Sequence, residues 1–147
     1  MASSKNRLGM LRRALAGQAG YRISLHDLNR KTPAYTVDTL HYFKKRYPRA
    51  SFFFIMGSDS LVDFPRWKRA SEILTMCRLA VVPRPSYKMT KVPALVRGHV
   101  DWINTQGLPV SSSRIRELVK QGPQVKRFLP PAVWRYIKDN SLYGYGG

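Results

Sequence analysis

Apolar residues at helical spacing alternate with short, continuous apolar runs along this chain. The helical spacing predicts helices over residues 6–16, 37–46, 70–76, 111–120 and 131–139. The shorter apolar or alternating runs predict strands over residues 21–25, 51–56, 77–82 and 99–103. Residues 84–98 are basic and interrupted by proline, which predicts a loop. Strands that alternate with helices are typical of an α/β fold with a parallel sheet.

The run Ser51–Met56 leads directly into Gly57-Ser58-Asp59-Ser60. A continuous apolar run that ends at a glycine turn predicts a strand buried on both faces. Ligands of parallel sheets bind beyond the carboxyl ends of the strands, so this turn is a candidate nucleotide site. Gly57 would allow close approach of the backbone, and Asp59 would accept hydrogen bonds from ribose hydroxyls. The alternative for Asp59 is a simple helix N-cap.

A run of three serines, Ser111, Ser112 and Ser113, begins the segment that predicts the helix over 111–120, and Arg116 lies within its first turn. The start of a helix has unpaired N–H groups and a positive dipole end, which favour a phosphate. The hydroxyls and the guanidinium add hydrogen-bond donors at the same place. We therefore expect a phosphate against Ser112, Ser113 and Arg116, in the same cleft as Gly57 and Asp59. An ordinary serine N-cap is the alternative.

Aromatic and basic residues form a third candidate site. Tyr35-Thr36 precedes a predicted helix, and Trp67 lies in the segment Phe64-Pro65-Arg66-Trp67-Lys68. An aromatic plane beside cations can stack a heteroaromatic ring and hold its acidic substituent. A tryptophan that only fills the core is the alternative. We expect Tyr35, Thr36 and Trp67 to lie together in a cleft at the carboxyl end of the sheet.

The charge of the chain limits the classes of partner that it could bind but does not identify one. Its 147 residues include 26 Lys and Arg against 8 Asp and Glu, a net charge of +18, and the length suits a single domain over residues 1–147. Such an excess suits nucleotides, RNA, DNA or an acidic surface, or else reflects general surface charge. The single cysteine, Cys77, adjoins an apolar run and predicts a buried thiol. The three histidines have no metal-ligand spacing, and no apolar run reaches the length of a membrane span.

The order of several blocks resembles bacterial nicotinate-nucleotide adenylyltransferase over residues 7 to 143. This resemblance implies a Rossmann-like nucleotidyltransferase fold. It implies synthesis of nicotinate adenine dinucleotide from nicotinate mononucleotide and ATP, with Mg²⁺ and release of pyrophosphate, in NAD biosynthesis. The blocks are Arg7–Leu11, Tyr35–Leu40, Phe53–Leu61, Pro65–Trp67, Val81–Pro85, Val110–Arg116, Leu129–Pro130, Tyr136–Ile137 and Leu142–Tyr143.

The resemblance also implies a role for each candidate residue. Trp67 would stack on the nicotinate ring, and Tyr35 and Thr36 would help to hold its carboxylate. Gly57 and Asp59 would contact the adenosine. The phosphates of ATP would be held by Ser111, Ser112, Ser113 and Arg116. Transfers of this kind depend mostly on positioning and charge neutralisation, so they need no nucleophilic triad.

The largest departure of the sequence from the family is at one motif. Family members carry a Gly-rich strand-to-helix turn with a His-x-Gly-His pair, and this pair is absent from these 147 residues. We therefore expect a truncated domain whose sheet lacks the first strand–helix–strand unit, leaving Ser51–Met56 with an unpaired edge. The chain alone is then expected to be inactive. Either the gene product is longer at its N-terminus, or a partner chain completes the sheet, or the chain has been retained as a binding module. The alternative function is a non-catalytic basic remnant that binds RNA, for example within a ribosome-like particle.

The first twenty residues contain four cations and no acid, as mitochondrial transit peptides do. The other interpretation is an ordinary helix with Leu8, Leu11 and Leu15 on one face, and the resemblance of Arg7–Leu11 to a family helix favours it. The sequence thus indicates a cytoplasmic protein, with a mitochondrial location as the alternative.

Overall fold

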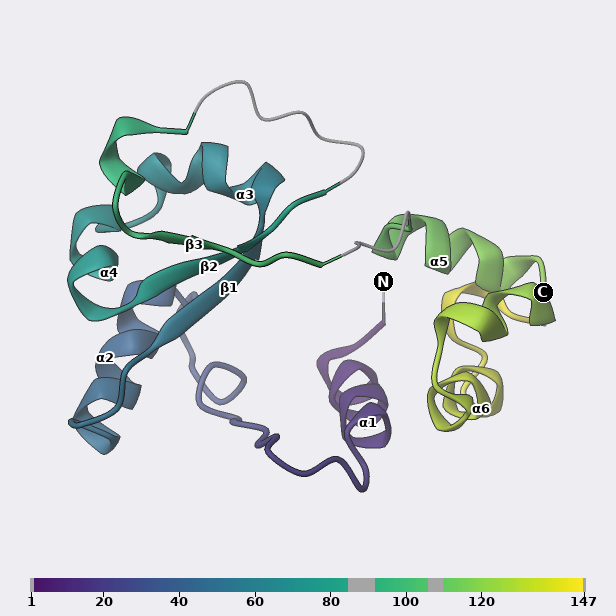
Figure 1. The fold of residues 1–147 in the computed structure, drawn as a ribbon. Coiled ribbons are helices and arrows are strands. Elements are labelled where there is room, and N and C mark those ends of the chain that lie inside the picture. The colour runs from purple at the N-terminus through teal and green to yellow at the C-terminus, as the bar shows by residue number, and fades with distance from the viewer. Residues whose placement is uncertain (1, 85–91, 106–109, 147) are drawn as a thin grey trace. The chain divides into compact units, whose positions relative to one another are not determined.

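A computed structural model describes residues 2–84, 92–105 and 110–146. The chain divides into two compact units, one formed by residues 26–109 and the other by residues 1–25 with 110–147 (Figure 1). The single domain expected over residues 1–147 stays a prediction. Of the predicted loop over 84–98, residues 85–91 lie outside the described residues, as do Met1 and Gly147 at the ends of the chain.

The unit of residues 26–109 is built on a parallel sheet in the order β1-β2-β3, which confirms the predicted α/β class. Phe53 pairs with Arg78 and Gly57 with Val82 in the first register, and Leu79 pairs with Val100 in the second. The strands are β1 (Phe53–Gly57), β2 (Arg78–Val82) and β3 (Val100–Trp102). The helices are α2 (Thr36–Arg46), α3 (Ser58–Asp63) and α4 (Ala70–Met76), with short 3-10 turns η1 (Phe64–Arg66) and η2 (Ala94–Val96).

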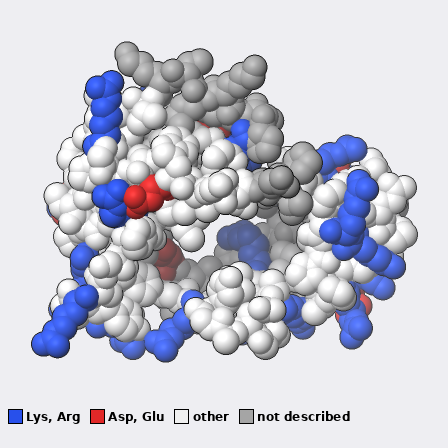
Figure 2. Space-filling view, in the orientation of Figure 1, with Lys and Arg blue, Asp and Glu red and all other residues white. Residues whose placement is uncertain are grey.

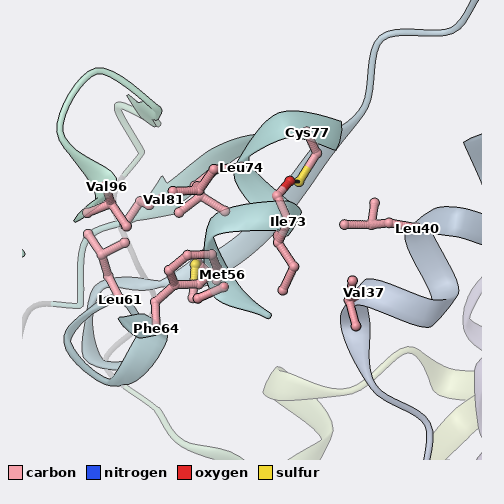
Figure 3. Close-up of a cluster of buried hydrophobic side chains, with 12 residues drawn as sticks. Val37, Leu40, Met56, Leu61, Phe64, Ile73, Leu74, Cys77, Val81 and Val96 are labelled. Carbon is pink, nitrogen blue, oxygen red and sulfur yellow. Dashed lines mark hydrogen bonds between the residues drawn. The ribbon is translucent and has the colours of Figure 1, made fainter. Parts of the chain in front are cut away.

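The three helices of this unit share one core with one face of the sheet, and α2 packs against α4. Val37 of α2 and Ile73 of α4 are fully buried together with Val81 of β2, and Figure 3 shows Val37 and Leu40 pointing toward Ile73. The predicted helices and strands between residues 37 and 103 are confirmed to within two residues at their ends, and α4 matches the prediction. The helix α3 and the 3-10 turns were not predicted.

Cys77 is buried at the end of α4, and its thiol donates a 3.5 Å hydrogen bond to the carbonyl of Ile73. Burial raises the pKa of this thiol above its ordinary value, because the low-dielectric surroundings disfavour the thiolate. The predicted buried thiol is confirmed.

The strand β1 is not buried on both faces, so that prediction is wrong. Phe54 and Met56 face the core, whereas Phe53 is 57% exposed and Ile55 is 73% exposed on the opposite face. The reason is that no element among the described residues covers this second face, and β1 forms one edge of the described sheet.

The other unit is helical and has its own core. Its elements are α1 (Ser4–Ala14), α5 (Ser112–Lys120), η3 (Pro123–Phe128), α6 (Pro131–Asp139) and η4 (Leu142–Gly144). Leu118 and Val119 of α5 are buried with Ile137 of α6, as the helical spacing predicts. Trp134 is also buried, although it was not among the residues expected to face inward.

The helix α1 packs against this core with a different face from the one predicted. Met10 and Ala14 contact the core, whereas Leu11 is exposed. The close approach of Tyr136 accounts for the face that α1 turns toward the core. A Cβ at Gly9 would lie 2.5 Å from the hydroxyl oxygen of Tyr136, and that hydroxyl donates to Asn6 Oδ1 at 3.1 Å. The strand predicted over 21–25 is wrong, because these residues do not adopt a strand and the described sheet consists of β1, β2 and β3.

No helix among the described residues is both long enough and apolar enough to span a bilayer.

Candidate functional site

Tyr35, Thr36 and Trp67 lie together around one cavity of about 320 Å³ in the unit of residues 26–109. The helix α2 places the first two, since Tyr35 is its N-cap residue and Thr36 its first helical residue. Trp67 follows η1 directly. The predicted grouping of these three residues is thus confirmed. The cavity is lined by Ala34, Tyr35, Thr36, Arg66, Trp67, Lys68 and Ile73.

The indole of Trp67 is held from two sides. Its ring meets Phe54 edge-on, with centroids 5.5 Å apart, and lies tilted against Phe64 at 5.3 Å. Edge-to-face contacts of this kind fix the plane of an aromatic ring. Phe54 lies on β1, three residues before the end of this strand at Gly57, so Trp67 packs against the strand. The expected position of the cavity at the carboxyl end of the sheet stays a prediction.

The cavity is electropositive. The Lys68 ammonium stands 4.0 Å from the centre of the Tyr35 ring, and Arg66 lies 3.7 Å from the exposed Asp63. The first N–H groups of α2, on Thr36 and Val37, have no hydrogen-bond acceptor among the described residues. The acid of the first turn, Asp38, is paired with Arg30 at 3.1 Å, and none of the residues that the structure describes around the cavity is a carboxylate. Two aromatic rings, two cations and a helix start therefore converge on one space, which suits a flat ring with an acidic group.

A second candidate group lies at the carboxyl end of β1. Gly57 is the N-cap of α3, and a Cβ there would lie 2.4 Å from Asp59 Oδ1 and 2.9 Å from Arg84 Nε. The absence of a side chain at Gly57 therefore makes room for the carboxylate and the guanidinium. The buried Ser58 accepts the backbone N–H of Arg84 at 3.0 Å, which ties the residues after β2 to this turn.

Asp59 retains an unused acceptor. Arg84 Nε lies 3.1 Å from Asp59 Oδ1, but not in hydrogen-bond geometry, so this buried oxygen has no donor among the described residues. Buried oxygens are normally hydrogen-bonded, so an unsatisfied one marks a position where a ligand hydroxyl can donate. Arg84 was not predicted as a site residue. Its position just after the second buried strand was the available signal, because the carboxyl ends of neighbouring parallel strands lie side by side.

The third group is the start of α5. Ser111 is its N-cap and accepts the N–H of Arg114 at 3.1 Å, so the simple capping interpretation holds for this serine. Arg116 donates to Ser113 Oγ at 3.0 Å, which keeps the guanidinium over the first turn. The N–H groups of Ser112 and Ser113 have no acceptor among the described residues. This turn belongs to the other compact unit, so its shared cleft with Gly57 and Asp59 stays a prediction.

Nothing in the described part of the chain resembles a metal centre, since no three His, Cys, Asp or Glu side chains come together there.

Comparisons with known proteins agree with the resemblance. A family model described as cytidylyltransferase-like matches residues 1–118. A probable nicotinate-nucleotide adenylyltransferase of Bacillus pumilus is 34% identical over 142 residues, which are 97% of this chain and 72% of that protein. One from Gloeobacter violaceus is 36% identical over 149 residues and again covers 97% of this chain and 72% of the relative.

Solved structures show the same fold. The nicotinic acid mononucleotide adenylyltransferase of Plasmodium falciparum complexed with APC superposes with a TM-score of 0.78 at 21% identity, covering 99% of this chain and 78% of that chain. The same enzyme complexed with NaAD gives a TM-score of 0.78 at 20% identity, covering 99% and 77%. The predicted Rossmann-like nucleotidyltransferase fold is thus confirmed. These relatives are named as adenylyltransferases, so the alternative of an RNA-binding remnant and that of a partner chain gain no support from them.

Proposed function

The chain belongs to the nicotinate-nucleotide adenylyltransferase family of NAD biosynthesis, within the cytidylyltransferase-like group, and from this we propose that it binds nicotinate mononucleotide and ATP. The observation that carries the proposal is the cavity beside Trp67. A pyridine ring fits between aromatic walls, and a carboxylate on that ring fits the free N–H groups of α2 and the ammonium of Lys68.

The adenosine part is assigned to the turn after β1. The unsatisfied Asp59 Oδ1 would accept a ribose hydroxyl, and Gly57 would let the nucleotide approach the backbone. Arg84 stands next to that oxygen and would either contact a phosphate or move with Asp59 when the nucleotide binds. The phosphates of ATP are assigned to Ser111, Ser112, Ser113 and Arg116, where free N–H groups, hydroxyls and a guanidinium meet.

Mg²⁺ belongs to this proposal as an ion that arrives on the phosphates of ATP. The described residues provide no cluster of three metal-binding side chains. Mg²⁺ is commonly held by substrate phosphates with only one or two carboxylates from the protein, so a site without a protein cage suits it. When bound, the ion would neutralise phosphate charge.

Calorimetry with two mononucleotides tests the proposal. Nicotinate mononucleotide should bind the chain at least about tenfold more tightly than nicotinamide mononucleotide, because only the acid gains charge-assisted hydrogen bonds in this cavity. Trp67→Leu should weaken binding of both ligands. The matched control is Trp102→Leu, which changes an exposed indole on β3 and should leave both affinities unchanged.

Lys68→Met is a second variant for the case in which Trp67→Leu does not fold. Lys68 is exposed, so its replacement should not disturb folding. This variant should reduce the preference for the acid and leave binding of the amide unchanged. Equal affinity of the parent for the two mononucleotides would reject the assignment of the cavity.

A further inference from the structure

A second cavity, of about 290 Å³, lies within the helical unit of residues 1–25 and 110–147. Three of its lining residues are cations, one is an aromatic residue and two are apolar. The lining residues of α6 recur at helical spacing, so one face of this helix forms a wall. Lys126 of η3 and Leu129, which follows η3, form the rest. The lining consists of Lys126, Leu129, Pro131, Trp134, Arg135 and Lys138.

The three cations of this cavity are not neutralised. Among the described residues, Lys126, Arg135 and Lys138 form no ion pair, and no carboxylate lines the space. The nearest acid in the sequence, Asp139, follows Lys138 and is likewise unpaired in the described part of the chain. Like charges around one cavity repel one another and attract a multiply charged anion. Figure 2 shows that blue side chains are frequent over α5 and α6.

Trp134 gives the cavity a fixed wall. Its side chain is only 6% exposed, and its ring meets that of Tyr145 edge-on at 5.1 Å. The apolar lining from Leu129 and Pro131 lowers the local dielectric, which strengthens the attraction between the cations and an anion. The three cations are exposed, so the buried Trp134 and the apolar lining are what distinguish this cavity from a plain surface cluster of cations.

We propose that this cavity binds a compact polyphosphate group, supplied either by free pyrophosphate or by the phosphate tail of a nucleotide. Its volume is at the lower end of the range for pockets that enclose drug-sized ligands, which suits a diphosphate better than a complete dinucleotide. The site shares no residue with the start of α5, and it does not depend on the proposed function.

Fluorescence of Trp134 tests the proposal. The chain has three tryptophans, so a Trp67→Phe/Trp102→Phe background leaves Trp134 as the reporter. Titration with pyrophosphate should change its emission, and Lys126→Ala/Lys138→Ala should weaken the fitted affinity at least about tenfold. The charge-matched control Lys5→Ala/Arg12→Ala alters exposed cations of α1 and should leave the affinity unchanged.

Two further measurements show whether the polyphosphate comes from free pyrophosphate or from a nucleotide, and whether it binds at the start of α5 instead. ATP that displaces pyrophosphate from the Trp134 site identifies a nucleotide tail, and failure of ATP to compete identifies free pyrophosphate. Inorganic phosphate should bind more weakly than either. The proposal is overturned if pyrophosphate leaves Trp134 emission unchanged, if the two double variants bind equally, or if Arg116→Ala alone removes the signal.

Discussion

Ser111 and Ser113 carry the same side chain but use it differently. The hydroxyl of Ser111 accepts a backbone N–H of its own helix, so it is occupied in capping. The hydroxyl of Ser113 accepts from Arg116 and thereby orients the guanidinium over the unpaired N–H groups of the first turn. A residue type alone therefore does not decide between a cap and a phosphate contact, because the partner of each hydroxyl decides it.

Arg116→Ala should weaken binding of ATP or pyrophosphate at the start of α5 by about 1.5–3 kcal/mol, the scale of a charge-assisted hydrogen bond. The guanidinium has no competing acid, because Glu117 is engaged by Lys120 at 3.3 Å. Calorimetry measures the affinity of the variant, with Arg114→Ala, two residues earlier in the same helix, as the matched control. Equal affinity for Arg116→Ala and the parent would leave the serines as a simple cap.

At the scale of elements, the covered and the uncovered side of the sheet predict losses of very different size for the same substitution. Ile73→Ala should lower the free energy of unfolding by about 2–5 kcal/mol, because Ile73 is fully buried at the centre of the core. Ile55→Ala should lower it by about 0.5 kcal/mol or less, because Ile55 is 73% exposed on β1.

Urea unfolding of the two variants measures this difference directly. A loss at Ile55 as large as that at Ile73 would contradict the exposed face of β1. It would show that another segment or chain covers this face in solution.

The sequence predicted most helices and strands because their apolar spacing is a local property. It missed the exposed face of β1 because an apolar run does not reveal whether both sides of a strand are covered. It also missed the packing face of α1, since the choice between Leu11 and Met10 depends on Tyr136, far along the chain. At the site, Tyr35, Thr36 and Trp67 were predicted from motifs, whereas Arg84 was missed, because its proximity to Asp59 depends on two strand ends that lie side by side only in the folded sheet.

The pair between Arg78 of β2 and Asp101 of β3 predicts a pH-dependent stability. Both carboxylate oxygens accept from this guanidinium at 2.6 Å, and these hydrogen bonds hold the pKa of Asp101 below its ordinary value of 3.8. A lowered folded-state pKa means that the stabilisation is present above 3.8 and is lost as the pH falls through the folded pKa. Asp101→Asn should therefore be less stable than the parent near neutral pH, and the gap should close in acid.

Urea midpoints across this pH range test the pair, with Asp139→Asn as the control at an exposed acid without an ion pair in the described residues. A gap between Asp101→Asn and the parent that stays constant with pH would show that the loss does not come from the charge of Asp101.

At the scale of the whole molecule, the net charge of +18 leaves many cations without acidic partners. Most of the carboxylates are already engaged, for example Glu72 with His41 and Arg69, and Asp38 with Arg30. Blue side chains are visible on both units on the face that Figure 2 shows. This distribution attracts phosphate ligands at a distance, and the effect weakens as salt screens the charges.

Attraction and positioning of the substrates are only part of what catalysis of this kind needs. The 147 residues contain no His-x-Gly-His pair, the feature expected from the family resemblance to activate the ATP phosphates. Charge stabilisation of that kind is typically worth several kcal/mol of barrier. We therefore expect the 147-residue chain, purified free of host enzyme, to make little or no nicotinate adenine dinucleotide even where both substrates bind. A pyrophosphate-release assay measures this turnover, with Trp67→Leu as the background control. Robust turnover that Trp67→Leu abolishes would contradict the expectation. Turnover that survives Trp67→Leu identifies contaminating host enzyme.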